Sequence, residues 1–264
     1  MIDKKNYVFL FSIVGLLLTT IIWSQSSKDN KVDDALFSEH SEKLSKGSVV
    51  LELFTSQGCS SCPPADALLE TIKDSYPDNV FVLSYHVDYW NYIGWKDPFS
   101  NQKFTVKQSV YNTKFRYRSN YTPELVVNGK EHMVGSNRAD VIRAVEKFSN
   151  LQSQNVIGIS NITRDGDKAT FEYNVNGKIE DKTIRAVLVL NERTTEVKRG
   201  ENRHRTLKNT NIVVAEKYLN DVKPKGFGSI EIPNLVGKNE ALTLMLLVEN
   251  EKVDITSAAK VAIY

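Results

Sequence analysis

Two apolar runs and one amphipathic stretch organise the first part of the chain. Residues 49–54 and 80–87 are rich in apolar and β-branched side chains, which indicates two buried strands. The segment between them predicts a helix with one buried face, because four apolar residues fall at i, i+3, i+4 and i+7: Ala65, Leu68, Leu69 and Ile72. Together these elements predict a βαβ unit.

Residues 90–120 are too long for a short crossover, and we expect a helical insertion there. Asp97 and Pro98 are residue types that cap and open a helix. Val106, Val110 and Phe115 then continue a helical stripe.

A hairpin and a helix are predicted to follow the insertion. Thr122-Pro123 precedes a strand at 124–127, and Asn128-Gly129 is typical of a two-residue turn before a return strand at about 131–134. Asn137 then caps a predicted helix.

Beyond residue 150 the pattern changes to short alternating segments separated by turns. They predict an antiparallel β-sandwich over 151–264. The expected strands are 156–162, 169–174, 184–190, 229–232, 241–248 and 260–264. The predicted fold class is therefore α/β with a helical insertion, followed by a C-terminal all-β sandwich.

The N-terminus differs from the rest of the chain. Lys4 and Lys5 precede an uncharged apolar run at 7–23, the arrangement of an export signal, and this length is also the lower limit for a spanning helix. Residues 1–23 are thus either a signal peptide or an N-terminal membrane anchor, and 24–47 form a polar spacer. In both cases the remainder is expected outside the cytoplasm, in the periplasm or cell envelope.

Composition agrees with a globular protein. Hydrophobic residues make up 41% of the chain and charged residues 25%, and the net charge is +2. So small a charge gives no reason to expect nucleic acid as a partner. No cofactor is expected.

Only two cysteines, Cys59 and Cys62, occur in the chain. A disulfide across so short a loop stabilises a fold by about 2 kcal/mol before strain is subtracted. A redox or metal-binding role is therefore expected in place of a structural one. At a helix N-terminus, Cys59 is predicted to be the nucleophile that attacks a partner's disulfide, and Cys62 to resolve the mixed disulfide.

This order of elements resembles the thioredoxin superfamily. Strand, Cys-x-x-Cys, helix and strand come first, and Thr122-Pro123 precedes the final hairpin and helix. The resemblance implies a thioredoxin-like domain at 48–150 and a cis peptide bond at Pro123, which shapes the peptide-binding groove and keeps metals off the thiols. The alternative is an ordinary trans proline that opens a strand.

Three segments narrow the resemblance to bacterial exported proteins grouped as domain of unknown function 1223. The segments are 52–66, 86–99 and 199–202. Because that family is uncharacterised, it supports a fold directly and a reaction only by analogy.

Two features depart from ordinary thioredoxins. Pro63 and Pro64 remove helix N–H groups after the second cysteine, and Leu53 occupies the position of the buried acid of thioredoxins. Glu52, one residue away, is a candidate proton shuttle for Cys62. The alternative for Glu52 is a partner for a charge elsewhere.

Further residues have two interpretations each. His86 and Asp88 share a strand face, so they form either a proton relay or metal-ligand pair beside the cysteines, or a satisfied core histidine and a helix cap. Four aromatic residues form either the core of the insertion or a peptide-binding wall: Tyr89, Trp90, Tyr92 and Trp95. A basic run is either a solvated loop or a surface that packs on the first domain or binds an anion: Arg199, Arg203, His204 and Arg205.

Three functions remain open from the sequence. The first is an extracytoplasmic thiol–disulfide oxidoreductase acting on exported protein thiols and disulfides, with an unknown redox partner. Ser60-Ser61 lacks the histidine of strongly oxidising sites, which slightly favours a reductase. The second is a Cu(I)- or Zn(II)-handling module that uses Cys59, Cys62 and His86. The third is a redox-switched binding or assembly protein.

Overall fold

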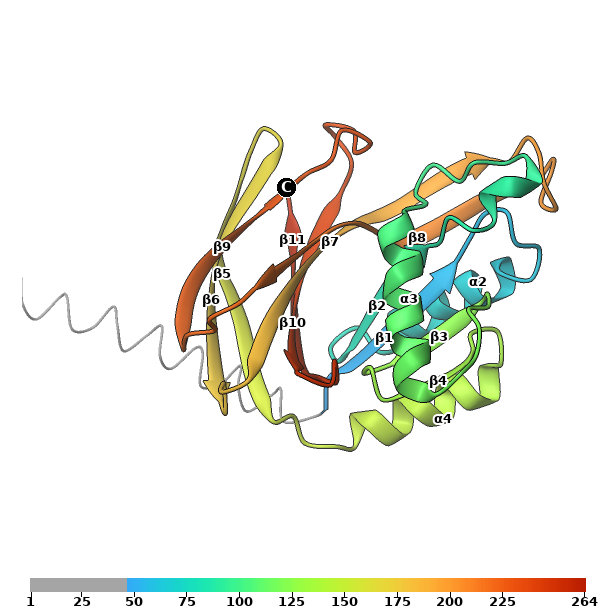
Figure 1. Cartoon of the computed structure of the whole chain (residues 1–264). Coiled ribbons are helices and arrows are strands. Elements are labelled where there is room, and N and C mark those ends of the chain that lie inside the picture. The colour runs from blue at the N-terminus through green and yellow to red at the C-terminus, as the bar shows by residue number, and fades with distance from the viewer. Residues whose placement is uncertain (1–46) are drawn as a thin grey trace, which may run out of the picture. The chain divides into compact units, whose positions relative to one another are not determined.

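The predicted βαβ unit is present in the computed structural model of the protein, which describes residues 47–264 (Figure 1). β1 (Val49–Thr55) and β2 (Val80–His86) pair in parallel, and α2 (Pro63–Ser75) connects them. The four residues of the predicted apolar face of α2 are all buried.

The hairpin and the helix that follow it are also confirmed. β3 (Glu124–Val127) pairs antiparallel with β1, and β4 (Glu131–Val134) pairs antiparallel with β3. Asn128 and Gly129 have φ values of 49° and 64°, the left-handed conformation that this two-residue turn requires. α4 (Arg138–Ser149) begins after Asn137, whose side chain accepts a hydrogen bond from the Asp140 backbone.

The segment between β2 and β3 differs from the prediction. It contains the 3-10 turn η1 (Asn91–Ile93) and α3 (Gln102–Phe115), and Asn101 caps α3, so the predicted start at Pro98 is wrong. Asp97 instead accepts a hydrogen bond from the Phe99 backbone. The predicted stripe is also wrong, because Val106 and Val110 are more than half exposed. The buried face is mixed: Phe104, Gln108, Tyr111 and Asn112.

The predicted fold class is wrong, because the chain does not form a thioredoxin-like α/β domain followed by a separate β-sandwich. Four later strands join β1–β4 in one mixed eight-stranded sheet of order β11-β10-β7-β8-β2-β1-β3-β4. They are β7 (Lys182–Glu196), β8 (Thr206–Leu219), β10 (Leu242–Asn250) and β11 (Ile255–Ile263). A second sheet contains β5 (Asn155–Asp165), β6 (Lys168–Gly177) and β9 (Lys225–Glu231). The described part of the protein is therefore mostly β.

Strand β8 explains this error, since it was not among the predicted strands. It pairs antiparallel with β7 and meets β2 in parallel at Ser84 and Ile212. The Ser84 hydroxyl also donates to the backbone carbonyl of Thr210, 126 residues away, at 2.9 Å. Inside β8, buried polar residues interrupt the apolar alternation that marks a strand: Asn209, Thr210 and Asn211.

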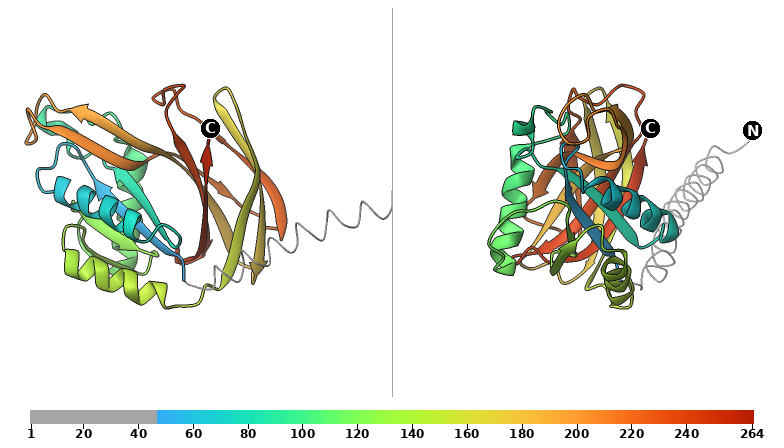
Figure 2. Two further views of the ribbon diagram at one scale, coloured as in Figure 1. Left: turned by 180° about the vertical axis from the view of Figure 1, so that it is seen from behind. Right: turned by 90° about the vertical axis from the view of Figure 1, so that its right-hand side faces the viewer.

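The helices cover both faces of the sheet around the Cys-x-x-Cys segment. α3 packs on one face of β1 and β2, and α2 and α4 pack on the other (Figure 2). The three-stranded sheet packs on β7, β10 and β11 through a third apolar cluster. Within residues 47–264, no helix has the length and apolar character needed to cross a membrane. The predicted signal or anchor at 1–23, and the spacer up to residue 46, lie outside the described residues.

A buried ion cluster connects the early and late strands of the large sheet. Arg185 on β7 is fully buried, and its guanidinium contacts three carboxylates. Nη1 lies 2.7 Å from Glu52 on β1 and 3.0 Å from Glu216 on β8, and Nη2 lies 2.5 Å from Glu249 on β10. Burial works against the charged form of Arg185, but the charges of Glu249 and Glu52 outweigh it and raise the pKa of Arg185.

Replacement of Arg185 by methionine is expected to destabilise the protein by about 3–5 kcal/mol, because it leaves buried carboxylates without their partner. Urea denaturation followed by circular dichroism measures this. The control is Arg143→Met, which removes an exposed ion pair with Asp140 and is expected to cost about 1 kcal/mol or less. Equal effects of the two substitutions would contradict the structural role given to Arg185.

Candidate active site

The Cys-x-x-Cys segment lies at the carboxyl end of β1. A turn leads into it, in which the backbone N–H of Cys59 donates to the Ser56 carbonyl at 3.1 Å. α2 begins at Pro63, immediately after Cys62, with prolines at its first two positions. Both cysteines are free thiols and buried, and Cys59 is 1% exposed.

The two thiols have pKa values shifted in opposite directions. A hydrogen bond from Cys62 contributes most to lowering the pKa of Cys59, burial opposes it, and the Ser61 hydroxyl, 3.2 Å from Sγ, lowers it further, to about 6. Burial first, and then the hydrogen bond and charge of Cys59, raise the pKa of Cys62 well above its ordinary value. Because prolines occupy the first two helix positions and have no N–H, neighbouring side chains replace the helix end as the main source of the Cys59 shift. At neutral pH Cys59 is therefore the thiolate and Cys62 the thiol.

The segment that contains Pro123 lies against Cys59. The Thr122–Pro123 peptide bond is cis, and the Thr122 carbonyl oxygen lies 3.9 Å from Cys59 Sγ. Trp90 Nε1 donates to the Thr122 hydroxyl at 2.7 Å. Trp90 therefore holds the Thr122–Pro123 segment that lies against Cys59. Tyr92, by contrast, is 82% exposed to solvent.

Asp66 is a site residue that the sequence analysis missed. It lies one helical turn after Cys62 on α2, and its carboxylate accepts a hydrogen bond from the Thr55 hydroxyl at 3.3 Å. The same hydroxyl also hydrogen-bonds Cys62. The residue is partly exposed, but burial of its carboxyl group raises the pKa of Asp66 to about 7. The i, i+4 spacing between Cys62 and Asp66 is the signal that identifies it.

His86 pairs with Asp97, and its charge interacts with that of Asp66. Its Nδ1 is 2.7 Å from the Asp97 carboxylate, and its buried Nε2 has no hydrogen-bond partner among the described residues. Burial lowers the pKa of His86, but the charge and hydrogen bond of Asp97, and the charge of Asp66, outweigh it and raise the pKa. Asp88, the predicted companion of His86, instead accepts a hydrogen bond from Thr105.

Asp97 and Gln57 fix the turn that presents the cysteines. The backbone N–H of Gln57 donates to the Asp97 carboxylate at 2.8 Å. The Gln57 side chain accepts a hydrogen bond from Trp95 Nε1 at 3.2 Å and donates one to Asn209 on β8 at 2.9 Å. The turn is therefore held from both sides, by the segment after β2 and by a strand from the second half of the chain.

The loop 197–205 between β7 and β8 closes on the same turn. The buried Asn202 amide donates to the backbone carbonyls of Gln57 at 3.0 Å and Cys59 at 2.8 Å. The Glu201 carboxylate accepts a hydrogen bond from the Ser60 backbone at 2.9 Å. Glu201 and Asn202, which lie inside the basic run, thus bind the Cys-x-x-Cys segment. The sequence left open whether this run is a solvated loop or packs on the first domain.

Two predicted roles find no matching geometry. Glu52 accepts hydrogen bonds from Tyr111 at 2.6 Å and from Arg185, and it makes no hydrogen bond to either cysteine. Among the described residues, no three His, Cys, Asp or Glu side chains are grouped as a metal ion requires, so Cys59, Cys62 and His86 do not form such a set.

Comparison with known proteins identifies the family. The chain belongs to the family described as "Protein of unknown function (DUF1223)", whose model matches residues 50–249. No curated protein matches the chain.

A solved structure from another bacterium shares the fold. The crystal structure of a protein from Agrobacterium tumefaciens is 26% identical, with a TM-score of 0.61, over 81% of this chain and 93% of that chain. A DUF3823 family protein from Bacteroides ovatus is 17% identical, with a TM-score of 0.27, over 40% of this chain and 54% of that chain, which is too weak to define a shared fold.

The reactivity of Cys59 is expected to rise through about pH 6 and level off above pH 7, because the thiolate is the reactive form. Iodoacetamide alkylation followed by mass spectrometry measures this profile. In Cys62→Ala the midpoint should move up toward the ordinary cysteine pKa of about 8.5, since a hydrogen-bond donor is lost. Cys62→Ser, which keeps a donor, is the matched control and should stay closer to the wild type. An unchanged midpoint in Cys62→Ala would refute the assigned cause.

Asp66→Asn is expected to stabilise the protein at pH 8 by about 3 kcal/mol and to have little effect at pH 3. The reason is the sign of the shift: the folded-state pKa of about 7 lies above the unfolded value, so ionisation of Asp66 costs stability as pH rises from about 4 to 7. Urea denaturation across this range tests it, with the exposed Asp140→Asn as control. Parallel stability curves for wild type and Asp66→Asn would rule out a buried, pKa-shifted carboxyl.

Proposed function

We propose that this chain is an extracytoplasmic thiol–disulfide oxidoreductase that acts on exported proteins through Cys59 and Cys62. The observation that carries the proposal is the arrangement of the pair: Cys59 and Cys62 lie between β1 and α2, the Thr122 carbonyl lies 3.9 Å from Cys59 Sγ, and Asp66 follows Cys62 by one helical turn. These surroundings lower the pKa of Cys59 and raise the pKa values of Cys62 and Asp66. Opposite pKa shifts in adjacent thiols suit one cysteine to attack a partner disulfide and the other to stay protonated until it resolves the mixed disulfide.

In the first step, the Cys59 thiolate attacks one sulfur of a partner disulfide. A bond forms between Cys59 Sγ and that sulfur, the partner's S–S bond breaks, and the other sulfur leaves as a thiolate that takes a proton from water. The Cys59 sulfur is buried and the exposed Ser61 side chain lies 3.2 Å from it, so in this proposal Ser61 moves aside when a partner docks.

In the second step, Cys62 gives its proton to Asp66 through the Thr55 hydroxyl and attacks Cys59 Sγ. The mixed disulfide breaks, the partner's second sulfur leaves as a thiolate, and a Cys59–Cys62 disulfide forms. The partner gains two electrons and the pair loses two, which an external dithiol donor restores. A carboxyl group with a pKa of about 7 suits this step, since it can both accept and return a proton at neutral pH.

The thioredoxin resemblance supports the proposal only at the level of the site. A parallel β1–α2–β2 unit, the cysteines before α2 and a cis-proline before β3 are the shared local features. The large mixed sheet is not shared, so the reaction is argued from the site residues and not from the fold.

The direction of electron flow depends on the reduction potential of the pair. A stable Cys59 thiolate stabilises the reduced form and moves the pair toward an oxidant, opposite to what Ser60-Ser61 suggests. Export rests on the N-terminal apolar run at 7–23, which acts either as a cleaved signal or as a membrane tether.

The test is turnover of a disulfide-linked fluorescent peptide by the full-length protein with dithiothreitol as donor, and oxidation of the reduced peptide in the reverse assay. Cys59→Ser is expected to abolish both reactions, and Cys62→Ser to accumulate a mixed disulfide visible by mass spectrometry. Asp66→Asn should slow resolution at pH 7 by about tenfold or more and remove its pH dependence near 7. A wild-type protein inert in both directions would refute the proposal.

A further inference from the structure

The loop 197–205 places several cationic side chains close to the segment that contains the proposed redox pair. Its inner residues, Glu201 and Asn202, bind the backbone of Ser60 and Cys59. A molecule that docks on this loop therefore lies close to the Cys-x-x-Cys segment.

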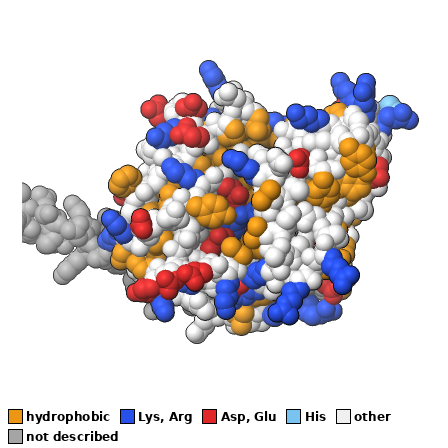
Figure 3. All heavy atoms as spheres, in the orientation of Figure 1, with side chains coloured by type: hydrophobic (Ala, Val, Ile, Leu, Met, Phe, Trp, Pro, Cys, Tyr) orange, Lys and Arg blue, Asp and Glu red, His pale blue; other side chains and the backbone are white. Residues whose placement is uncertain are grey.

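The charge of this hairpin end is strongly positive. Between residues 196 and 208 the chain has five Lys and Arg residues and two Glu residues: Lys198, Arg199, Arg203, Arg205 and Lys208 against Glu196 and Glu201. Figure 3 shows Lys, Arg and His side chains gathered at one end of the molecule, above a patch of hydrophobic side chains. Glu201 accepts a hydrogen bond from the Ser60 backbone and keeps its negative charge, so five positive and two negative side chains give this segment a net charge of +3 with His204 neutral.

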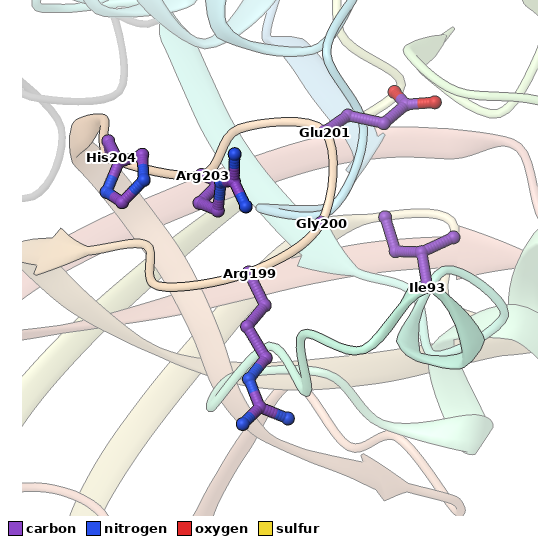
Figure 4. Close-up of a pocket in the computed structure, with 6 residues that line it drawn as sticks. All are labelled: Ile93, Arg199, Gly200, Glu201, Arg203 and His204. Carbon is purple, nitrogen blue, oxygen red and sulfur yellow. The ribbon is translucent and has the colours of Figure 1, made fainter.

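A depression of about 790 Å³ is lined by Arg199, Arg203 and His204 together with Glu201, Gly200 and Ile93. Within residues 47–264, none of the first three side chains has a carboxylate or hydrogen-bond partner, whereas Arg205 is held by Asn202. Figure 4 shows the three spread along the loop, with Ile93 opposite. The two arginines outnumber Glu201, the acidic residue of this lining, and their guanidinium groups suit carboxylates that approach from solvent.

The loop is held in position by the 3-10 turn. Gly200 has φ +76°, and a Cβ on it would lie 2.9 Å from Ile93 Cδ1, so the chain needs glycine for both its conformation and the close approach. Tyr92, which precedes the lining residue Ile93 in the chain, is 82% exposed and offers an apolar surface to a partner. A broad surface with separated cations and an exposed aromatic ring fits an extended peptide segment better than a compact small molecule.

We infer that this surface binds an acidic segment of the partner protein, so that the preferred substrate carries Asp or Glu residues next to its disulfide. This inference rests on the proposed function and specifies its substrate class. Opposite charge raises the rate of encounter and fixes the orientation of the partner. Screening by salt weakens such an attraction when the charges are exposed.

The experiment uses three peptides that differ only in two positions next to the cysteine: Glu-Glu, Gln-Gln and Lys-Lys. Serine versions, which cannot react, report binding by fluorescence anisotropy, and disulfide versions report kcat/KM with the full-length protein. The acidic peptide is expected to exceed the neutral one by about tenfold in both measurements at low salt, and the basic peptide to fall below it. In 0.5 M NaCl the ratio should fall toward one.

Arg199→Gln combined with Arg203→Gln should bring the acidic-to-neutral ratio close to one. The matched control is Arg138→Gln with Arg143→Gln, which removes the same charge from the exposed face of α4 and should leave the ratio as in the wild type. Turnover without a charge preference would overturn this inference and leave the proposed function standing. A binding preference without any turnover would overturn the proposed function and leave the acidic-segment site standing.

Discussion

The buried guanidinium of Arg185 is the interaction on which the arrangement of this protein depends. A charge this deep must be matched by carboxylates in fixed positions, and they come from β1, β8 and β10. Strands from both halves of the chain are thereby tied into one sheet. The consequence for the site is direct, because β8 and the loop before it are held against the Cys-x-x-Cys turn.

The candidate site is accordingly assembled from parts far apart in the sequence. β1 and α2 present the cysteines, Asp97 holds the turn, and Asn202 fixes it from the second half of the chain. The nucleophilic character of Cys59 comes mainly from Cys62 and Ser61, which are local. Local residues thus set the chemistry of the pair, and distant ones set its position and its surroundings.

The local elements around the cysteines follow from the sequence because their signals are local. The spacing of Leu68 and Ile72, the Asn128-Gly129 turn and the Asn137 cap each depend on a few neighbouring residues. The fold class does not follow in the same way. The joining strand β8 has buried polar residues that interrupt its alternation, and its pairing with β2 is a tertiary contact that no local period reveals.

The same distinction applies to the site residues. The position of Glu52 beside Leu53 makes it a candidate proton shuttle in the sequence. Successive strand residues point to opposite faces of a sheet, however, and the Glu52 side chain lies on the face opposite to Leu53, where it pairs with Arg185. Asp66 lies on the same helix face as Cys62, whereas the resemblance to thioredoxins points to an acid on the preceding strand, and it therefore does not indicate Asp66. The role of loop 197–205 required the structure, since its contacts with Cys59 and Ser60 span more than 140 residues.

The most direct test of the central claim is the reduction potential of the Cys59–Cys62 pair in the full-length protein. The protein is equilibrated with reduced and oxidised glutathione, and the intramolecular disulfide is quantified by mass spectrometry after thiol trapping. The account predicts a two-electron couple between about −120 and −270 mV, the range of thiol–disulfide oxidoreductases. A pair that forms no intramolecular disulfide, or one with a potential below about −300 mV as in inert structural disulfides, would contradict it.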